Sequence, residues 1–320
     1  MRRRCVNPRS AERRGANARA RRPGWRSVPS GAARLACESL AGALMVALLS
    51  ACSAPPIKAP NAAQTSAQTL SLNGARALRR GDLTAALAAY NEALAAAESV
   101  EDFDAAGTSL LNLAAVHARL GQADAAHARL DRIGNAPQRY SETQQGQAAA
   151  RKALLYLDSG AHGTAMHWAD QAQAACPEPC NLTPAMTNVR AFVALERGDL
   201  QRAAGMAARA AELAAAAGLA AEQANSLRLQ GRAETRLGNT TPAAEVLARA
   251  LQIDRELGLP ERIALDLMHA GENEERRGQM AAAREFYERA MQVSTAASLP
   301  KLVDELRTRL QQSAGSPAPR

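Results

Sequence analysis

The sequence predicts an all-α solenoid of about six helix pairs, closed at its C-terminal end by a capping helix. Two observations carry this prediction. Each of six glycines has a small residue seven positions before it and an alanine five positions after it. These glycines stand 38–40 residues apart, at Gly81, Gly121, Gly160, Gly198, Gly238 and Gly278. A fixed period in this range indicates a stack of repeated units rather than a domain with a single core.

Each copy of the repeat is expected to contain two antiparallel helices. The glycine ends the first helix with a positive φ, and small residues allow the two helices to approach closely. Apolar residues at helical spacing, such as Leu110, Leu113 and Val116, fill the rest of the seam. The small position before the glycine is occupied in turn by Gly74, Ala114, Ala153, Ala191, Gly231 and Gly271. The small position after it is occupied by Ala86, Ala126, Ala165, Ala203, Ala243 and Ala283.

Over residues 67–298 this pattern resembles the tetratricopeptide repeat (TPR), in copies of about 40 residues instead of the usual 34. The family also has an aromatic residue four positions after the middle alanine. Tyr90 and Tyr287 match it, whereas the other four copies have Leu130, Ala169, Ala207 and Leu247. The resemblance implies a right-handed α-solenoid that binds a protein or peptide partner in its concave groove.

Composition divides the chain into four parts. Residues 1–51 form a basic leader with a signal peptide, and residues 52–66, with three prolines, form a tether. Residues 67–312 form the solenoid, in which the amphipathic stretch after Pro300 caps the open end. Residues 313–320 are expected to be a disordered tail.

The leader indicates export and lipidation. Its arginines precede the apolar run Leu40–Leu49, which is too short to span a membrane but suits a secretory signal. Leu49-Ser50-Ala51-Cys52 resembles the bacterial lipobox, which implies that Cys52 is diacylated and becomes the mature N-terminus. Ser53 is not the aspartate that retains enteric lipoproteins in the inner membrane. We therefore expect a lipid anchor at the periplasmic face of the outer membrane.

The basic charge of the chain belongs to its leader. Residues 1–51 contain eleven arginines and two glutamates, a net charge of +9, and the whole chain has +8. The remainder therefore has a net charge of −1, and a chain so close to neutral lacks the basic surface that non-specific phosphate binding needs. The sequence thus argues against a nucleic-acid partner.

Two cysteines remain in the solenoid, Cys176 and Cys180 in Cys-Pro-Glu-Pro-Cys, and an oxidising periplasm favours a disulfide between them. Free thiols are one alternative. A metal site or metal-dependent enzyme using His162, His167 and the two cysteines is another, because the spacings suit zinc. Phosphate-binding loops, nucleophile elbows and paired metal-ligand helices are missing from the sequence. We therefore expect a protein that is not an enzyme and needs no cofactor.

The register of the glycines selects side chains on the first helix of each copy that would face the groove. They are Asn112, Arg151, Asn188, Phe192, Arg228, Arg232, His269 and Glu272. Arg228, Arg232 and Arg236 are four residues apart and would form a basic stripe able to hold a carboxylate of an acidic partner. A solvated helix face explains the stripe equally well. The expected function is a scaffold or adaptor in envelope assembly, and a structural spacer without a groove ligand is the alternative.

Overall fold

The computed structural model describes residues 59–315, with side chains as far as residue 312. This part of the chain contains thirteen helices, which alternate as first and second helices of each pair. The pairs are α2 (Ala62–Arg79) with α3 (Leu83–Glu98), α4 (Phe103–Arg119) with α5 (Ala123–Gly134), α6 (Glu142–Asp158) with α7 (His162–Ala174), α8 (Thr183–Glu196) with α9 (Leu200–Ala216), α10 (Ala220–Leu237) with α11 (Thr240–Glu256), and α12 (Pro260–Arg276) with α13 (Met280–Ala296). Helix α14 (Pro300–Gly315) follows the last pair.

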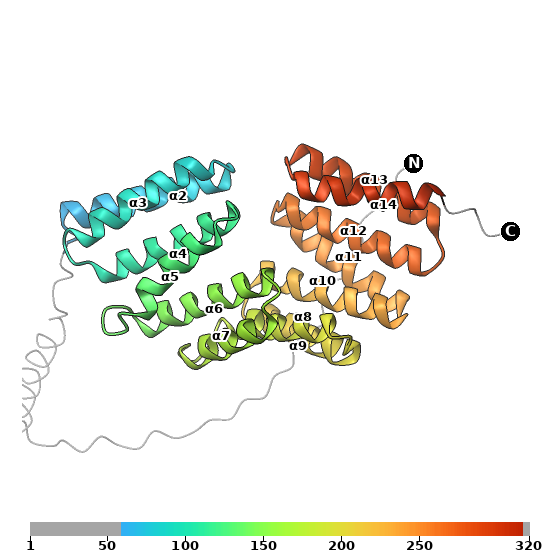
Figure 1. The fold of residues 1–320 in the computed structure, drawn as a ribbon, viewed down its shortest axis with the longest axis horizontal. Helices are drawn as coiled ribbons and strands as arrows, with labels where there is room; N and C mark the ends of the chain where they lie inside the picture. The colour runs from blue at the N-terminus through green and yellow to red at the C-terminus, as the bar shows by residue number, and fades with distance from the viewer. Residues whose placement is uncertain (1–58, 316–320) are drawn as a thin grey trace, which may run out of the picture. The chain divides into compact units, whose positions relative to one another are not determined.

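The helix pairs stack in chain order, as the ribbon in Figure 1 shows from blue to red. Each second helix packs on the first helix before it and on the first helix after it. The first helices also contact one another directly, α2 with α4 and so on to α12, whereas no two second helices of the described chain do so to a comparable extent. The row of first helices is therefore the inner side of the stack, and we call its exposed side the inner face.

The domain limits differ slightly from the predicted ones. Helix α2 begins at Ala62, so part of the expected tether belongs to the first helix, whose start is capped by Asn61 and Gln64. The capping helix runs from Pro300 to Gly315, three residues beyond its predicted end. The signal peptide, Cys52 and the final residues 316–320 lie outside the described residues. No helix among those that are described has the length and apolar character needed to cross a membrane.

The six glycines of the repeat end the first helices as predicted. Their φ values lie between +72° and +86°. In each turn the backbone N–H of the next residue donates to the carbonyl five positions earlier, as from Asp82 to Ala77 at 3.0 Å. This is the hydrogen bond of a Schellman motif, which satisfies a carbonyl that the helix end would leave unpaired.

A second left-handed position, which the sequence pattern did not reveal, lies twenty residues after the glycine in four copies. Gly218 and Gly258 occupy it with φ of +68° and +65°, whereas Glu101 and Ser298 adopt it with φ of +54° and +55°. A side chain there costs roughly 1–2 kcal/mol. The second and third copies use longer connections instead, over residues 135–141 and 175–182.

The seams between paired helices match large residues with small ones. A Cβ added at Gly271 would lie 2.5 Å from the Tyr287 ring, and one added at Gly74 would lie 2.7 Å from the ring of Tyr90. The third copy has Ala153 and Ala169 at these two places, and both are fully buried. The residue seven positions before the turn glycine therefore faces the aromatic position of the second helix. The aromatic position varies between copies because its size depends on whether this facing residue is glycine or alanine.

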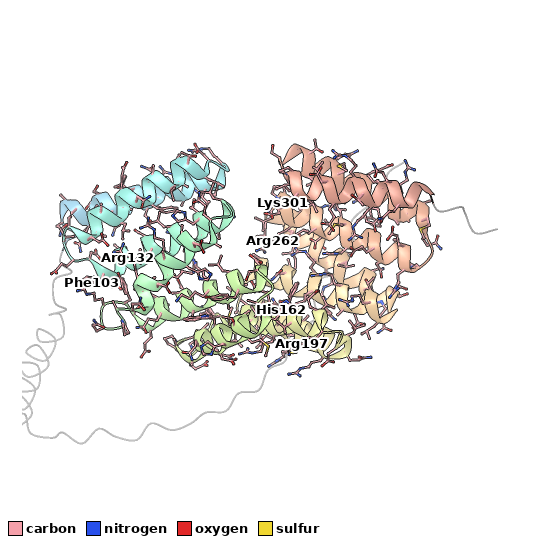
Figure 2. The ribbon with its side chains drawn as sticks, viewed as in Figure 1. Phe103, Arg132, His162, Arg197, Arg262 and Lys301 are labelled. Atoms are coloured by element: carbon pink, nitrogen blue, oxygen red, sulfur yellow. A yellow bond between two sulfur atoms is a disulfide. The ribbon has the colours of Figure 1, made fainter. Side chains whose placement is uncertain are left out.

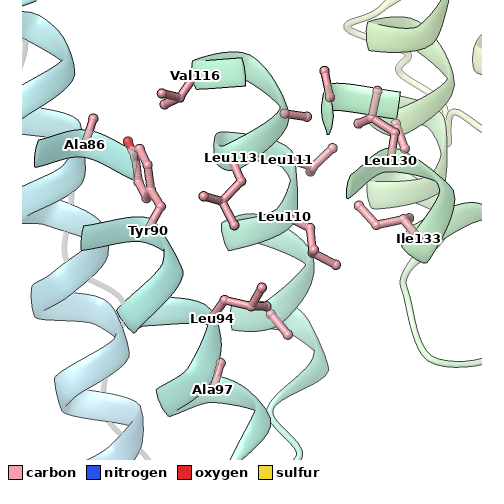
Figure 3. Close-up of a cluster of buried hydrophobic side chains, with 14 of the residues drawn as sticks. Ala86, Tyr90, Leu94, Ala97, Leu110, Leu111, Leu113, Val116, Leu130 and Ile133 are labelled. Atoms are coloured by element: carbon pink, nitrogen blue, oxygen red, sulfur yellow. The ribbon is translucent and has the colours of Figure 1, made fainter. Parts of the chain in front are cut away.

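The core is continuous from copy to copy but has no single centre. Figure 3 shows the cluster of the first copies, where Tyr90 and Leu94 of α3 face Leu113 and Leu110 of α4. Further clusters follow along the chain, and the last one includes Leu302 and Leu306 of α14. Helix α14 thus covers apolar surface of α13 that a further copy would otherwise cover.

Gly271→Ala is expected to destabilise the protein by about 1–3 kcal/mol, because the new methyl group overlaps a buried ring. Adding Tyr287→Leu should recover part of this loss, since Ala114 and Leu130 already stand together in the second copy. Urea unfolding of the two single variants and the double variant measures the coupling between the positions.

The matched control is Gly205→Ala on α9, where an added Cβ meets nothing within 4 Å. This change should stabilise the protein by about 0.5–1 kcal/mol. Additive effects at positions 271 and 287 would contradict the proposed size matching.

Candidate partner-binding face

The eight side chains assigned to the groove all lie on first helices, from α4 to α12. The structure divides them into three groups according to burial and partners. Asn188, Arg228 and His269 are buried, with 5%, 6% and 8% of their surface exposed. Phe192, Arg232 and Glu272 are half-buried and contact other side chains. Asn112 and Arg151 are half-buried too, and they differ in what surrounds them.

Two of the three buried residues, Asn188 and Arg228, join neighbouring copies, and His269 is hydrogen-bonded to Glu272 of its own helix, which differs from the prediction that all three face a partner. The Asn188 amide donates to Ser226 Oγ at 2.7 Å and to Glu222 Oε1 at 2.6 Å, and both acceptors lie on α10. The Arg228 guanidinium donates to Asp266 Oδ1 of α12 at 2.6 Å and to the carboxylate of Asp254 on α11. The predicted basic stripe therefore loses its first member, because Arg228 already has two buried carboxylates as partners.

The other two arginines of the stripe have a shared acidic partner. Arg232 and Arg236 of α10 each place a guanidinium nitrogen 3.9 Å from Glu196 Oε1 of α8. The Arg232 guanidinium also lies over the ring of Phe192, 5.5 Å from its centre. Burial lowers the pKa of Arg232, and the nearby carboxylates of Glu272 and Glu196 oppose this effect. The stripe is thus engaged within the protein.

Helix α12 and the capping helix α14 are joined through a chain of three side chains. His269 Nδ1 lies 2.7 Å from Glu272 Oε2, and Glu272 Oε1 lies 2.5 Å from a guanidinium nitrogen of Arg309 on α14. Burial lowers the pKa of His269, and the hydrogen bond and charge of Glu272 oppose this effect. Burial alone would raise the pKa of Glu272, but the His269 hydrogen bond and the charges of His269, Arg309 and Arg232 lower it. The ionised Glu272 therefore accepts hydrogen bonds from both neighbours.

Arg151 of α6 has no such partner. Burial lowers the pKa of its guanidinium, and within residues 59–315 no carboxylate or other acceptor pairs with it. The other buried or half-buried arginines of the inner face all have an acidic or carbonyl partner. An unpaired charge that has lost part of its hydration is costly in a folded protein and is typical of binding sites.

Two exposed leucines lie on the same N-terminal half of the inner face as Arg151. Nine positions before their glycines, the first three copies have Leu72, Asn112 and Arg151. Leu72 is 59% exposed, and Leu154, one turn after Arg151, is 45% exposed. Both leucines are among the most exposed large apolar side chains of the described residues. Neither leucine was among the predicted groove residues, because an isolated leucine in a helical pattern is expected to be part of the core.

The cysteines form a disulfide in the connection between α7 and α8. Closing so short a ring contributes about 2 kcal/mol in the loop-entropy model.

His162, labelled in Figure 2, packs edge-on against Phe192, and His167 packs against Trp168. The described chain contains no group of three or more metal-ligating side chains. The structure thus does not bring the two histidines and two cysteines together as a metal site would require.

The buried partners that the sequence analysis missed follow a simple rule. Side chains of neighbouring first helices meet when they are 38 residues apart, as in Asn188 with Ser226, Arg228 with Asp266, and Thr235 with Asn273. Contacts to backbone carbonyls have nearly the same separation: Arg262, labelled in Figure 2, donates to the Ala221 carbonyl 41 residues earlier. Searching for complementary polar residues just under one period apart would have revealed these pairs.

Comparison with known proteins supports the fold and not a family assignment. No protein-family model matches the sequence, and no curated protein matches it. Among solved structures, the chain is similar to one from a signal-transduction ATPase of Pyrococcus horikoshii that has a tetratricopeptide repeat sensor, with a TM-score of 0.56 and 12% identity over 79% of this chain and 37% of that one.

Two other structures show the same likeness. A chain of the APC/C hetero-tetramer Cut9–Hcn1 has a TM-score of 0.57 and 15% identity, and the match covers 75% of this chain and 43% of that one. A Rap protein in complex with competence and sporulation factor has a TM-score of 0.56 and 12% identity, over 78% and 76% of the two chains. The chain therefore spans less than half the length of the Cut9–Hcn1 chain and of the signal-transduction ATPase. The fold is a TPR solenoid, as the repeat pattern predicted.

Proposed function

We propose that this protein is a non-enzymatic scaffold of the bacterial envelope, whose inner face binds an extended acidic segment of a partner protein. The observation that carries the proposal is the unpaired, partly buried guanidinium of Arg151, with the exposed Leu154 one turn further along α6 and the exposed Leu72 at the equivalent position of α2, two copies earlier. A partner carboxylate would supply the missing acceptor, and arginine binds carboxylates through two parallel hydrogen bonds. The Rap protein named above was solved with a bound factor, which is consistent with ligand binding by this kind of fold.

The neighbouring side chains suit the rest of such a segment. The Asn112 amide, at the equivalent position of α4, has both a donor and an acceptor for a peptide backbone. Leu72 and Leu154 offer apolar surface to side chains flanking the acidic residue. The C-terminal half of the face has few free polar groups, because its arginines and acids are paired with one another. We therefore place the contact on α2, α4 and α6.

The anchor completes the proposal. With Cys52 diacylated, the solenoid would hang from the periplasmic face of the outer membrane, held by acyl chains whose buried methylenes contribute about 0.8 kcal/mol each. A mature chain with a net charge of −1 and a disulfide in its third connection suits this oxidising compartment. The protein would then hold an acidic partner close to the membrane during assembly of the envelope.

Arg151→Ala should weaken binding of an acidic peptide by roughly ten- to hundredfold, the value of a charged hydrogen-bonded contact. A random peptide-display library selected on the purified protein supplies the probe, and we expect an acidic consensus. Isothermal titration then compares the best peptide on the wild type, on Arg151→Ala and on Arg119→Ala, an exposed arginine of α4 that serves as the control. A neutral consensus, or equal loss in both variants, would contradict the site. Failure to enrich any peptide would favour the structural spacer.

Cys52→Ser should move the protein from the membrane fraction to the soluble fraction of the envelope and abolish its labelling by radioactive palmitate. Cys37→Ser is the matched control, because Arg34 stands where a lipobox needs an aliphatic residue, and it should change neither result. The proposed anchor would be rejected if the Cys52 variant were still labelled.

A further inference from the structure

Three charged side chains are enclosed where the fifth copy meets the sixth. Arg228 comes from α10, Asp254 from α11 and Asp266 from α12, and neither aspartate has any exposed surface. The guanidinium donates from Nε to Asp266 and from a terminal nitrogen to Asp254. Its other terminal nitrogen donates to Asn225 Oδ1 at 3.3 Å. One side chain thus holds three helices of two copies together.

The charges in this cluster do not balance if both carboxyl groups are ionised. Two carboxylates would face one guanidinium, and each has one buried oxygen without a partner in the described chain, Asp254 Oδ1 and Asp266 Oδ2. An uncompensated charge in such a place costs several kcal/mol. Two carboxyl groups that share a site commonly resolve this by retaining one proton between them.

The charged groups around the cluster do not supply the missing cation. On α10 the next arginine is Arg232, whose acidic neighbour is Glu196. On α12, His269 is hydrogen-bonded to Glu272, and Arg309 of α14 is paired with Glu272. Tyr287 is the buried titratable side chain of α13, and burial raises its pKa, so it is neutral. Among the described residues, Arg228 is the only cation bonded to Asp254 and Asp266.

The electrostatics of Asp266 agree with this geometry. Burial raises the pKa of its carboxyl group to about 7, with Arg228 acting against the shift and Asp254 adding to it. The folded protein therefore binds this proton more tightly than the unfolded chain does. The stability that the proton provides is complete below the ordinary aspartate pKa of about 4, decreases as the pH rises, and is lost once the pH passes about 7.

We propose that Arg228, Asp254 and Asp266 form a proton-dependent joint between the fifth and sixth copies. With one proton shared by the two carboxyl groups, the cluster is neutral and α12 packs firmly on α10 and α11. When the proton leaves for bulk water, a net negative charge remains buried, and the last copy and its capping helix separate more readily from the fifth copy. Because solenoid copies contact only their neighbours, such opening can stay local. The C-terminal end of the inner face would then change with pH, independently of which partner binds elsewhere.

The test compares hydrogen-exchange protection of α12–α14 with that of α4–α6 in the purified protein at pH 5, 6, 7 and 8, corrected for intrinsic exchange. For a one-proton joint, the opening constant of α12–α14 should rise by up to about tenfold per pH unit between pH 5 and 7, while that of α4–α6 changes little. Asp266→Asn keeps an oxygen for Arg228 and leaves one balanced pair, so it should remove the pH dependence and increase protection at pH 8. Asp304→Asn, an exposed residue of α14, should behave as the wild type.

A second measurement observes the proton itself, and its decisive result comes from the wild type. Infrared difference spectra of the wild type between pH 5 and pH 8 should contain the band of a protonated, buried carboxyl group, which Asp304→Asn retains and Asp266→Asn or Asp254→Asn removes. The joint would be disproved by a wild-type spectrum without that band. Equal pH dependence of protection in the wild type and in Asp266→Asn would overturn it as well.

Discussion

The structure depends above all on how closely the two helices of each copy can approach. The glycine of each turn, such as Gly81 or Gly278, reverses the chain within a Schellman hydrogen bond, so the second helix always begins at the same place relative to the first. The residue seven positions earlier then lies opposite the middle of the second helix. Where that helix has a tyrosine, the facing residue is glycine, as in Gly271 with Tyr287, whereas a leucine faces either glycine, as in Gly231 with Leu247, or alanine, as in Ala114 with Leu130. This spacing fixes the register of every contact between copies.

Much of the fold could be predicted from the sequence because its constraints are local. A positive φ and a small seam residue are required whatever lies in the next copy, so six in-phase glycines were sufficient to define the helix pairs. The positions of Glu101 and Ser298 could not be predicted in this way, since neither residue favours the left-handed conformation that it adopts. The start of α2 at Ala62 was also missed, because the Asn61–Gln64 capping box lies inside a stretch that composition alone assigned to the tether.

The candidate site was predictable in position and not in chemistry. The register placed eight side chains on first helices, but it could not say which of them the neighbouring copy uses. Arg228 and Asn188 satisfy buried groups one copy further along the chain, and of the eight only Arg151 and Asn112 have no side-chain partner among the described residues. Polar contacts between copies therefore divide the inner face. Its C-terminal half uses its charges to hold the stack together, whereas its N-terminal half leaves a cation, an amide and two leucines for another molecule.

The central claim is that the N-terminal half of the inner face is where a partner binds. Site-specific photocrosslinking in cells tests it most directly, with the photoreactive residue placed at Leu154 of α6 or, as the control, at the exposed Glu92 of the second helix α3. We expect a specific crosslinked protein from position 154, carrying an acidic segment at the crosslink, and none from position 92. Equal crosslinking from both positions, or no product from position 154, would contradict it.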